Sequence, residues 1–168
     1  MSILIQKTTK TTDFLSILGI FALIFVISLQ LSCAKSNACD LKASYVNDVN
    51  TQQNTAMVAF CTTNNITYTT HPSGILYQII TPGVETKPNL CETISMTYVG
   101  TLLNGTKFDA GTISYSLSQL IVGWQIAVPL IGKGGRIKVV LPSSLGYGAQ
   151  ASGPIPANSP LYFDITLN

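Results

Sequence analysis

The chain has 168 residues, a formal net charge of +2, and charged side chains at only 10% of its positions. An average soluble domain has roughly 25% charged residues, so this chain is weakly charged rather than basic, which argues against nucleic acid as a partner. Four cysteines and one histidine, with no Cys-x-x-Cys pair, argue against a zinc site. We therefore expect no metal site and no cofactor.

Residues 1–32 are predicted to be a lipoprotein signal peptide. Lys7 and Lys10 precede a long apolar run, Phe14–Leu31, and a small residue and Cys33 follow it. This order resembles the bacterial lipoprotein signal, in which the cysteine receives a diacylglyceryl group, although Gln30 departs from the usual aliphatic residue. We expect Cys33 to be a lipid anchor in the bacterial cell envelope, facing the periplasm or the cell surface. An uncleaved membrane anchor and a soluble secreted chain are the alternatives, and all three place the remainder outside the cytoplasm.

Residues 33–73 are predicted to be a polar tether rich in Asn, Gln, Ser and Thr. A short helix is predicted around Val46–Phe60, although its apolar residues repeat only raggedly. In an oxidising compartment a Cys39–Cys61 disulfide is one possibility, and unpaired, buried cysteines are the other, since connectivity does not follow from sequence.

From Gly74 onward the pattern predicts mostly β-strands. Alternating apolar and polar residues, or short apolar runs of β-branched and aromatic residues, indicate each strand. Asn104–Gly105 is a strong hairpin signal, because both residue types tolerate positive φ. The predicted strands are 75–80, 92–102, 106–111, 136–141 and 161–167.

A sheet with one apolar face needs a cover, and one segment is able to supply it. In residues 120–130, Ile121, Trp124 and Val128 recur at helical spacing, and Pro129 ends the predicted helix by removing a backbone donor. The predicted fold is α+β, with a curved antiparallel sheet wrapped around one short helix that turns Trp124 toward the sheet. Judged by itself, Trp124 would be a core residue and nothing more.

Four stretches of the chain, taken in order, resemble the FKBP-type peptidyl-prolyl cis-trans isomerases. They are MTYVGTLLNGTKFDAG (96–111), YSLSQLIVGWQIAVPLI (115–131), GGRIKVVLPSSLGYG (134–148) and GPIPANSPLYFDITL (153–167). Each block is weak alone, but four blocks in sequence with matching spacing make a chance match very improbable. The resemblance covers Gly74–Asn168, is closest to bacterial envelope members, and implies the FKBP-like form of the predicted fold.

The resemblance also implies a function for residues 74–168. It implies a domain that accelerates X–Pro rotation in unfolded or partly folded envelope proteins and that binds macrolide inhibitors, without a cofactor. The alternative is a protein that is not an enzyme: a non-catalytic FKBP-like binding module, or holdase, on a lipid anchor. A structural or adhesive β-domain would explain the composition but not the ordered motifs.

Residue by residue, the resemblance implies an apolar, aromatic pocket. Trp124 would form its floor, Tyr147 would donate its O–H to the peptide carbonyl, and the Ile121 backbone N–H would be a second donor. Asp109 would lie at the pocket edge, bonded to Tyr98. The implied catalytic residues are Tyr98, Asp109, Trp124 and Tyr147, and the implied substrate-binding residues are Phe108, Leu120, Ile121, Ile155 and Phe163.

The neighbouring loops complete this expectation. Gly146 and Gly148 are predicted to let the backbone bend so that Tyr147 points across the pocket mouth. Ile155, in a proline-rich loop, would close the rim. Two departures from the family pattern stand out: the loop between Asp109 and Tyr115 is predicted to be short, and Ile113 replaces an aromatic residue that some members have there.

Overall fold

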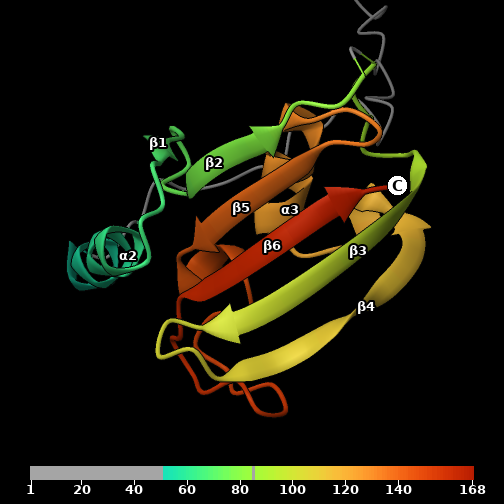
Figure 1. Cartoon of the computed structure of the whole chain (residues 1–168). Helices are drawn as coiled ribbons and strands as arrows, with labels where there is room; N and C mark the ends of the chain where they lie inside the picture. The colour runs from blue at the N-terminus through green and yellow to red at the C-terminus, as the bar shows by residue number, and fades with distance from the viewer. Residues whose placement is uncertain (1–50, 85) are drawn as a thin grey trace, which may run out of the picture. The chain divides into compact units, whose positions relative to one another are not determined.

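The computed structural model describes residues 51–84 and 86–168, which contain six strands in one sheet and two α-helices (Figure 1). The predicted signal peptide, Cys33 and residues 34–50 lie outside the described residues. The elements are α2 (Thr51–Thr63), β1 (Thr69–Thr70), β2 (Leu76–Thr81), β3 (Thr93–Leu102), β4 (Lys107–Ser116), η1 (Leu117–Gln119), α3 (Val122–Ala127), η2 (Val128–Leu130), β5 (Arg136–Leu141), η3 (Ser143–Leu145) and β6 (Leu161–Leu167). Neither α-helix in this part of the chain is long and apolar enough to cross a membrane.

The sheet has the strand order β1-β2-β5-β6-β3-β4, and every neighbouring pair is antiparallel. The predicted strands 75–80, 92–102, 136–141 and 161–167 are confirmed as β2, β3, β5 and β6. The hairpin at Asn104–Gly105 is also confirmed, with Gly105 at φ +88° and the Asn104 side chain accepting from the Thr106 N–H. Predicted strand 106–111 is part of the longer strand β4.

Strand β4 corrects one expectation from the sequence. A short loop was predicted between Asp109 and Tyr115, but the chain stays extended there and pairs with β3 from Lys107 to Ser116. The physical reason is that these residues contain no proline and include the β-branched Thr112 and Ile113 and the aromatic Tyr115, residue types that favour a pleated strand. β4 is therefore a long strand at one edge of the sheet (Figure 1), and its pairing with β3 shifts register only between Lys107 and Asp109.

The main core lies between the sheet and α3. Every second residue of β6, from Leu161 to Leu167, is buried, while the residues between them are half-buried on the opposite face. The same alternation buries Ile137, Val139 and Leu141 of β5 and four residues of β3. The prediction of a sheet wrapped around one short helix is confirmed. α3 ends where predicted, since Pro129 lies in the 3₁₀ turn η2 that follows it.

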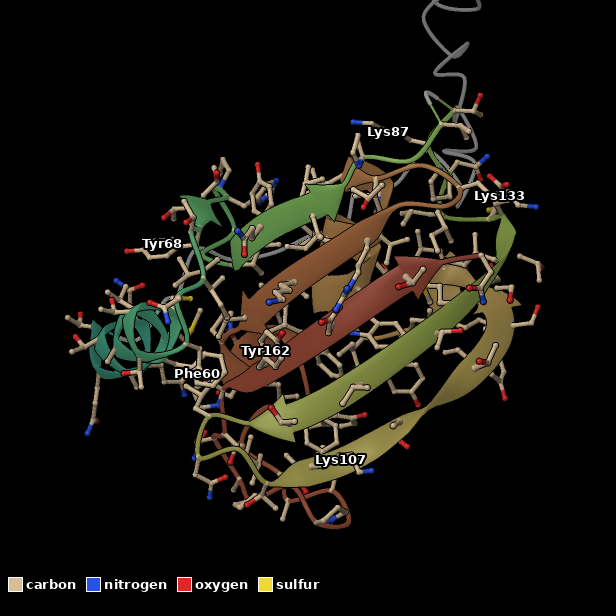
Figure 2. The ribbon with its side chains drawn as sticks, in the orientation of Figure 1. Phe60, Tyr68, Lys87, Lys107, Lys133 and Tyr162 are labelled. Atoms are coloured by element: carbon tan, nitrogen blue, oxygen red, sulfur yellow. The ribbon has the colours of Figure 1, made fainter. Side chains whose placement is uncertain are left out.

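Helix α2 packs against the other face of the sheet. Met57 and Cys61 are fully buried there, in a second apolar cluster with Leu76 of β2 and Val140 of β5. Figure 2 shows Phe60 of α2 beside Tyr162 of β6. The centroids of the two rings lie 5.2 Å apart.

Residues 51–73 were placed in the tether by their polar composition, but in the structure they are held against the sheet. The predicted helix around Val46–Phe60 is observed as Thr51–Thr63. Whether the isomerase domain begins at Gly74, as the resemblance implies, stays a prediction.

The structure decides between the two alternatives left open for Cys61. Cys61 is a free, buried thiol, so the Cys39–Cys61 disulfide is wrong, and the alternative of an unpaired, buried cysteine holds for this residue. Burial raises the pKa of the Cys61 thiol. Cys91, by contrast, is disulfide-bonded.

Candidate active site

A hollow of about 400 Å³, counted with the space open to solvent, opens between α3, β4 and the segment that follows η3. Its walls come from five separate stretches of the chain, so only the tertiary fold assembles it. The lining residues are Tyr98, Phe108, Asp109, Ile113, Leu120, Ile121, Trp124, Tyr147 and Phe163. Eight of the nine residues that the family resemblance implied are therefore brought together.

Aromatic rings form the floor and the inner wall of the hollow. Trp124 is 4% exposed and packs edge-to-face with Tyr98 and Phe163, at centroid distances of 4.9 and 5.1 Å. Phe163 in turn packs edge-to-face with Phe108 at 5.6 Å. Edge-to-face packing is a favoured arrangement of aromatic rings, so these rings form a well-packed apolar floor. The Trp124 indole N–H is buried, and no described residue accepts its hydrogen bond.

The one carboxylate that lines the hollow is hydrogen-bonded through both of its oxygens. Asp109 Oδ2 accepts a hydrogen bond from the Tyr98 hydroxyl at 2.5 Å, and Oδ1 accepts from the Ala110 N–H at 2.9 Å. The expected bond between Tyr98 and Asp109 is thus present. Because both carboxylate oxygens are engaged, this geometry suits Asp109 to holding the Tyr98 ring in place.

Two uncharged donors remain available at the mouth. Tyr147 is 40% exposed, and its hydroxyl has no acceptor among the described residues. Burial and the nearby negative charge of Asp109 raise the pKa of Tyr147, so the phenol keeps its proton at neutral pH. The Ile121 N–H, at the start of α3, likewise has no acceptor in the described part of the chain. Both groups can donate to a carbonyl oxygen placed in the hollow.

The loop that carries Tyr147 differs in detail from expectation. Gly148 has φ +68°, a conformation that favours glycine, as predicted. Gly146 has negative φ, and its place is explained by close packing, because a Cβ there would lie 3.1 Å from Leu161 Cδ1.

Ile155 does not line the hollow. Ser152 and Ile155 exchange two backbone hydrogen bonds, and this tight turn directs the Ile155 side chain into the main core, where it is 4% exposed. Ile113 takes a place in the lining instead. It shares one face of β4 with Asp109, so strand alternation was the signal that could have found it.

A pH prediction follows from Tyr98. Burial first, and then the bond to Asp109, raise the pKa of Tyr98 to about 12 from an ordinary value of 10.0. The folded state therefore holds this proton more tightly than the unfolded state does. That contribution to stability is complete below about pH 10 and is lost as the pH rises toward 12. We expect the free energy of unfolding, measured with urea at stepped pH, to decline less steeply over this range in Tyr98→Phe. Parallel curves for the two proteins would contradict the assignment.

Comparison with known proteins agrees with this geometry. The family model described as "FKBP-type peptidyl-prolyl cis-trans isomerase" matches residues 84–168. Over 100 residues the chain is 40% identical to the FKBP-type peptidyl-prolyl cis-trans isomerase FkpA of Aeromonas hydrophila, a match that covers 56% of this chain and 37% of that protein. It is also 40% identical over 102 residues to the outer membrane protein MIP of Legionella longbeachae, covering 57% of this chain and 44% of that protein.

Solved structures give the same result. The crystal structure of FkpA from Escherichia coli superposes with a TM-score of 0.63 at 28% identity, covering 96% of this chain and 73% of that one. A peptidyl-prolyl cis-trans isomerase from Pseudomonas syringae superposes with a TM-score of 0.58 at 30% identity, covering 71% of this chain and 95% of that one. The chain matches less than half the length of the two sequence relatives named above, but the family model covers its whole C-terminal half. The chain belongs to the FKBP-type peptidyl-prolyl cis-trans isomerase family.

Proposed function

We propose that the chain is a peptidyl-prolyl cis-trans isomerase that accelerates X–Pro rotation in unfolded or partly folded proteins of the bacterial cell envelope. The observation that carries the proposal is the aromatic hollow floored by Trp124, with Tyr147 and the Ile121 N–H as uncharged donors at its mouth. Family membership supports it independently.

The chemistry asks little of the protein beyond such a hollow. An X–Pro bond rotates slowly because amide resonance opposes it, with a barrier of about 18–20 kcal/mol. The planar ground state is polar, whereas the twisted transition state has lost resonance and is less polar. An apolar hollow therefore favours the twisted state relative to water, and each tenfold gain in rate requires only about 1.4 kcal/mol of this preference.

The named residues have distinct roles in this mechanism. Trp124 is the surface on which the proline ring lies, with Phe108 and Phe163 beside it. Tyr147 and the Ile121 N–H hold the flanking carbonyl groups, so that rotation occurs about a fixed frame. Tyr98 and Asp109 position the wall. No proton is transferred, which agrees with a hollow whose single carboxylate is already hydrogen-bonded.

The direct test is an isomerisation assay on a short Ala-X-Pro-Phe peptide, with the full chain in mild detergent and with and without a macrolide inhibitor. We expect catalysis that the macrolide suppresses. A rate equal to that of buffer, from folded protein that still binds the peptide, would favour the alternative of a non-catalytic binding module or holdase. Loss of both binding and catalysis in well-folded protein would reject the site itself.

Tyr147→Phe is a finer test of the hydrogen bond at the mouth. We expect affinity for the peptide or macrolide to fall about three- to tenfold, the usual effect of losing one hydrogen bond. The free energy of unfolding should hardly change, because no described residue accepts from this hydroxyl. Titration calorimetry measures the first quantity and urea unfolding the second. Tyr68→Phe, on the side of α2 (Figure 2), is the matched control. Unchanged affinity in Tyr147→Phe would count against this role.

The location in the envelope is part of the proposal. Its support is the order of residues 1–33, with Cys33 as the lipid anchor, and the name of the relative from Legionella longbeachae, an outer membrane protein. Mass spectrometry of the mature N-terminus tests it, since cleavage before Cys33 with an added diacylglyceryl group is expected. An N-terminus without lipid would instead favour a soluble secreted chain or an uncleaved anchor.

A further inference from the structure

Strand β4 joins the candidate pocket to an open edge of the sheet. It is the last strand in the order β1-β2-β5-β6-β3-β4 and has ten residues. Its pairing with β3 has no bulge between Asp109 and Ser116. Asp109 and Ile113 of this strand line the hollow. Figure 1 shows β4 as the outermost strand on its side of the sheet.

The register shows which backbone groups of β4 face outward. The Asn168 N–H donates to Ser95 O, so odd-numbered residues of β3 bond toward β6 and even-numbered ones toward β4. The partners of these even-numbered residues in β4, such as Gly111 opposite Tyr98, then bond inward. Ala110, Thr112 and Ser114 consequently turn their N–H and C=O groups away from the sheet.

Two side-chain observations agree with this assignment. The Ala110 N–H donates to Asp109 Oδ1 and not to β3. Thr97 and Thr112 face each other with their hydroxyl oxygens 2.9 Å apart, as in the closely spaced, non-hydrogen-bonded pairs of an antiparallel ladder.

This edge is unprotected in the part of the chain that the structure describes. The N–H groups of Thr112 and Ser114 have no backbone partner there. Natural sheets usually shield such edges with charged residues, proline or very short strands. β1, at the opposite edge, has two residues, whereas β4 between Asp109 and Ser116 has neither proline nor lysine. The open stretch ends near Ser116, where the segment around Leu90 accepts from Ser116 Oγ and from the Ser118 N–H.

A gap in the pocket rim leads to this edge. Gly111 lies between Asp109 and Ile113 on the pocket-facing side of β4, and a Cβ there would meet nothing within 4 Å. A peptide backbone can therefore cross the rim at Gly111 without contacting a side chain of that residue. Further along the same face, Tyr115 is 53% exposed and offers an aromatic surface.

We propose that the substrate segment preceding the proline pairs with β4 as an added strand, through Thr112 and its neighbours, while the proline occupies the hollow. This rests on the isomerase function proposed above. The residue before a proline is already biased toward an extended conformation. Pairing with β4 therefore costs this residue little conformational entropy. Main-chain pairing does not depend on side chains, which suits an enzyme with many different substrates. The exposed Tyr115 would then contact a substrate side chain.

Peptide length and backbone methylation test the pairing without altering the protein. We expect kcat/KM for a peptide extended by about six residues before the X–Pro bond to exceed that of the tetrapeptide by at least three- to tenfold. N-methylation at each position from two to five residues before the proline should then lower kcat/KM at alternate positions only. No gain on extension, or a loss that does not alternate, would overturn the pairing, while activity on the tetrapeptide would leave the proposed function intact.

A pair of variants tests the same edge from the protein side. Gly111→Val fills the gap in the rim and should reduce the long-to-short ratio of kcat/KM toward one. Ala110→Val places a valine side chain on the opposite face of β4 and should preserve the ratio. Equal ratios in the two variants would contradict the proposal.

Hydrogen exchange separates the possible occupants of the edge. The Thr112 and Ser114 amides should exchange more slowly when the long peptide is added to the full chain. Slowing that instead follows protein concentration, without peptide, would show that the edge pairs with a second copy of the chain, and would overturn the proposal.

Discussion

Replacing Trp124 by alanine is expected to lower the free energy of unfolding by about 3–5 kcal/mol, as for other large aromatic residues in cores. Trp124 is 4% exposed and contacts both Tyr98 and Phe163, so the variant leaves a cavity that the surrounding rings cannot fill. Under the proposed function the same change removes the surface on which the proline lies. Isomerisation should therefore fall to near the buffer rate even in the fraction that remains folded. Urea unfolding and the peptide assay measure the two effects.

Trp124→Phe is the matched comparison. It keeps an aromatic floor and removes the buried indole N–H, which has no acceptor among the described residues. A buried donor without an acceptor lowers the free energy of unfolding by about 1–3 kcal/mol. We expect Trp124→Phe to be clearly more stable than Trp124→Ala and to retain part of the activity. Val84→Ala, at a site 56% exposed, should change stability by no more than about 0.5 kcal/mol. Equal stability of the alanine variant and the parent would mean that Trp124 is not a core residue.

Gly100→Ala is expected to displace aromatic rings that line the hollow. Gly100 of β3 lies opposite Asp109 of β4 and Phe163 of β6. A Cβ at this position would lie 2.7 Å from Phe108 Cζ and 2.8 Å from Phe163 Cε1, closer than side-chain atoms can approach. The rings must therefore shift from their places in the lining of the hollow. We expect stability to fall by about 1–3 kcal/mol, as in other overpacked cores, and isomerisation to fall at least tenfold.

The control for this variant is Gly111→Ala on the neighbouring strand, where the added methyl group meets nothing within 4 Å. Its free energy of unfolding should match that of the parent or exceed it slightly, because glycine weakens a strand interior. Near-UV circular dichroism would report displacement of the rings in Gly100→Ala. If activity survives unchanged in Gly100→Ala while the rings move, the hollow is not the place where the X–Pro bond rotates.

Much of the fold was predictable because it follows from local sequence patterns. Apolar and polar residues alternate in 92–102, 136–141 and 161–167, and this alternation predicted three strands. Successive side chains of a strand point to opposite faces, so the apolar residues of these strands face one core. Asn104–Gly105 predicted the hairpin, and Pro129 predicted the end of α3. Eight of the nine residues that the four ordered motifs implied for the site line the hollow.

Other features depended on contacts between residues far apart in the chain. Residues 51–63 have no clear apolar period, so their composition predicted a tether. They form a docked helix because Leu76 and Val140 supply an apolar surface on the far side of the sheet. Cys61 is fully buried in that contact, and its thiol is free.

The sequence by itself determined the fold class, the family and most of the aromatic residues of the site, because these follow from local periodicity and from motifs with fixed spacing. Only the tertiary structure decided that Ile113 and not Ile155 lines the hollow, and that, among the residues the structure describes, β4 has an unpaired edge beside the pocket. The physical reason is that each of these depends on the relative placement of segments distant in sequence, and strand order and turn geometry set that placement.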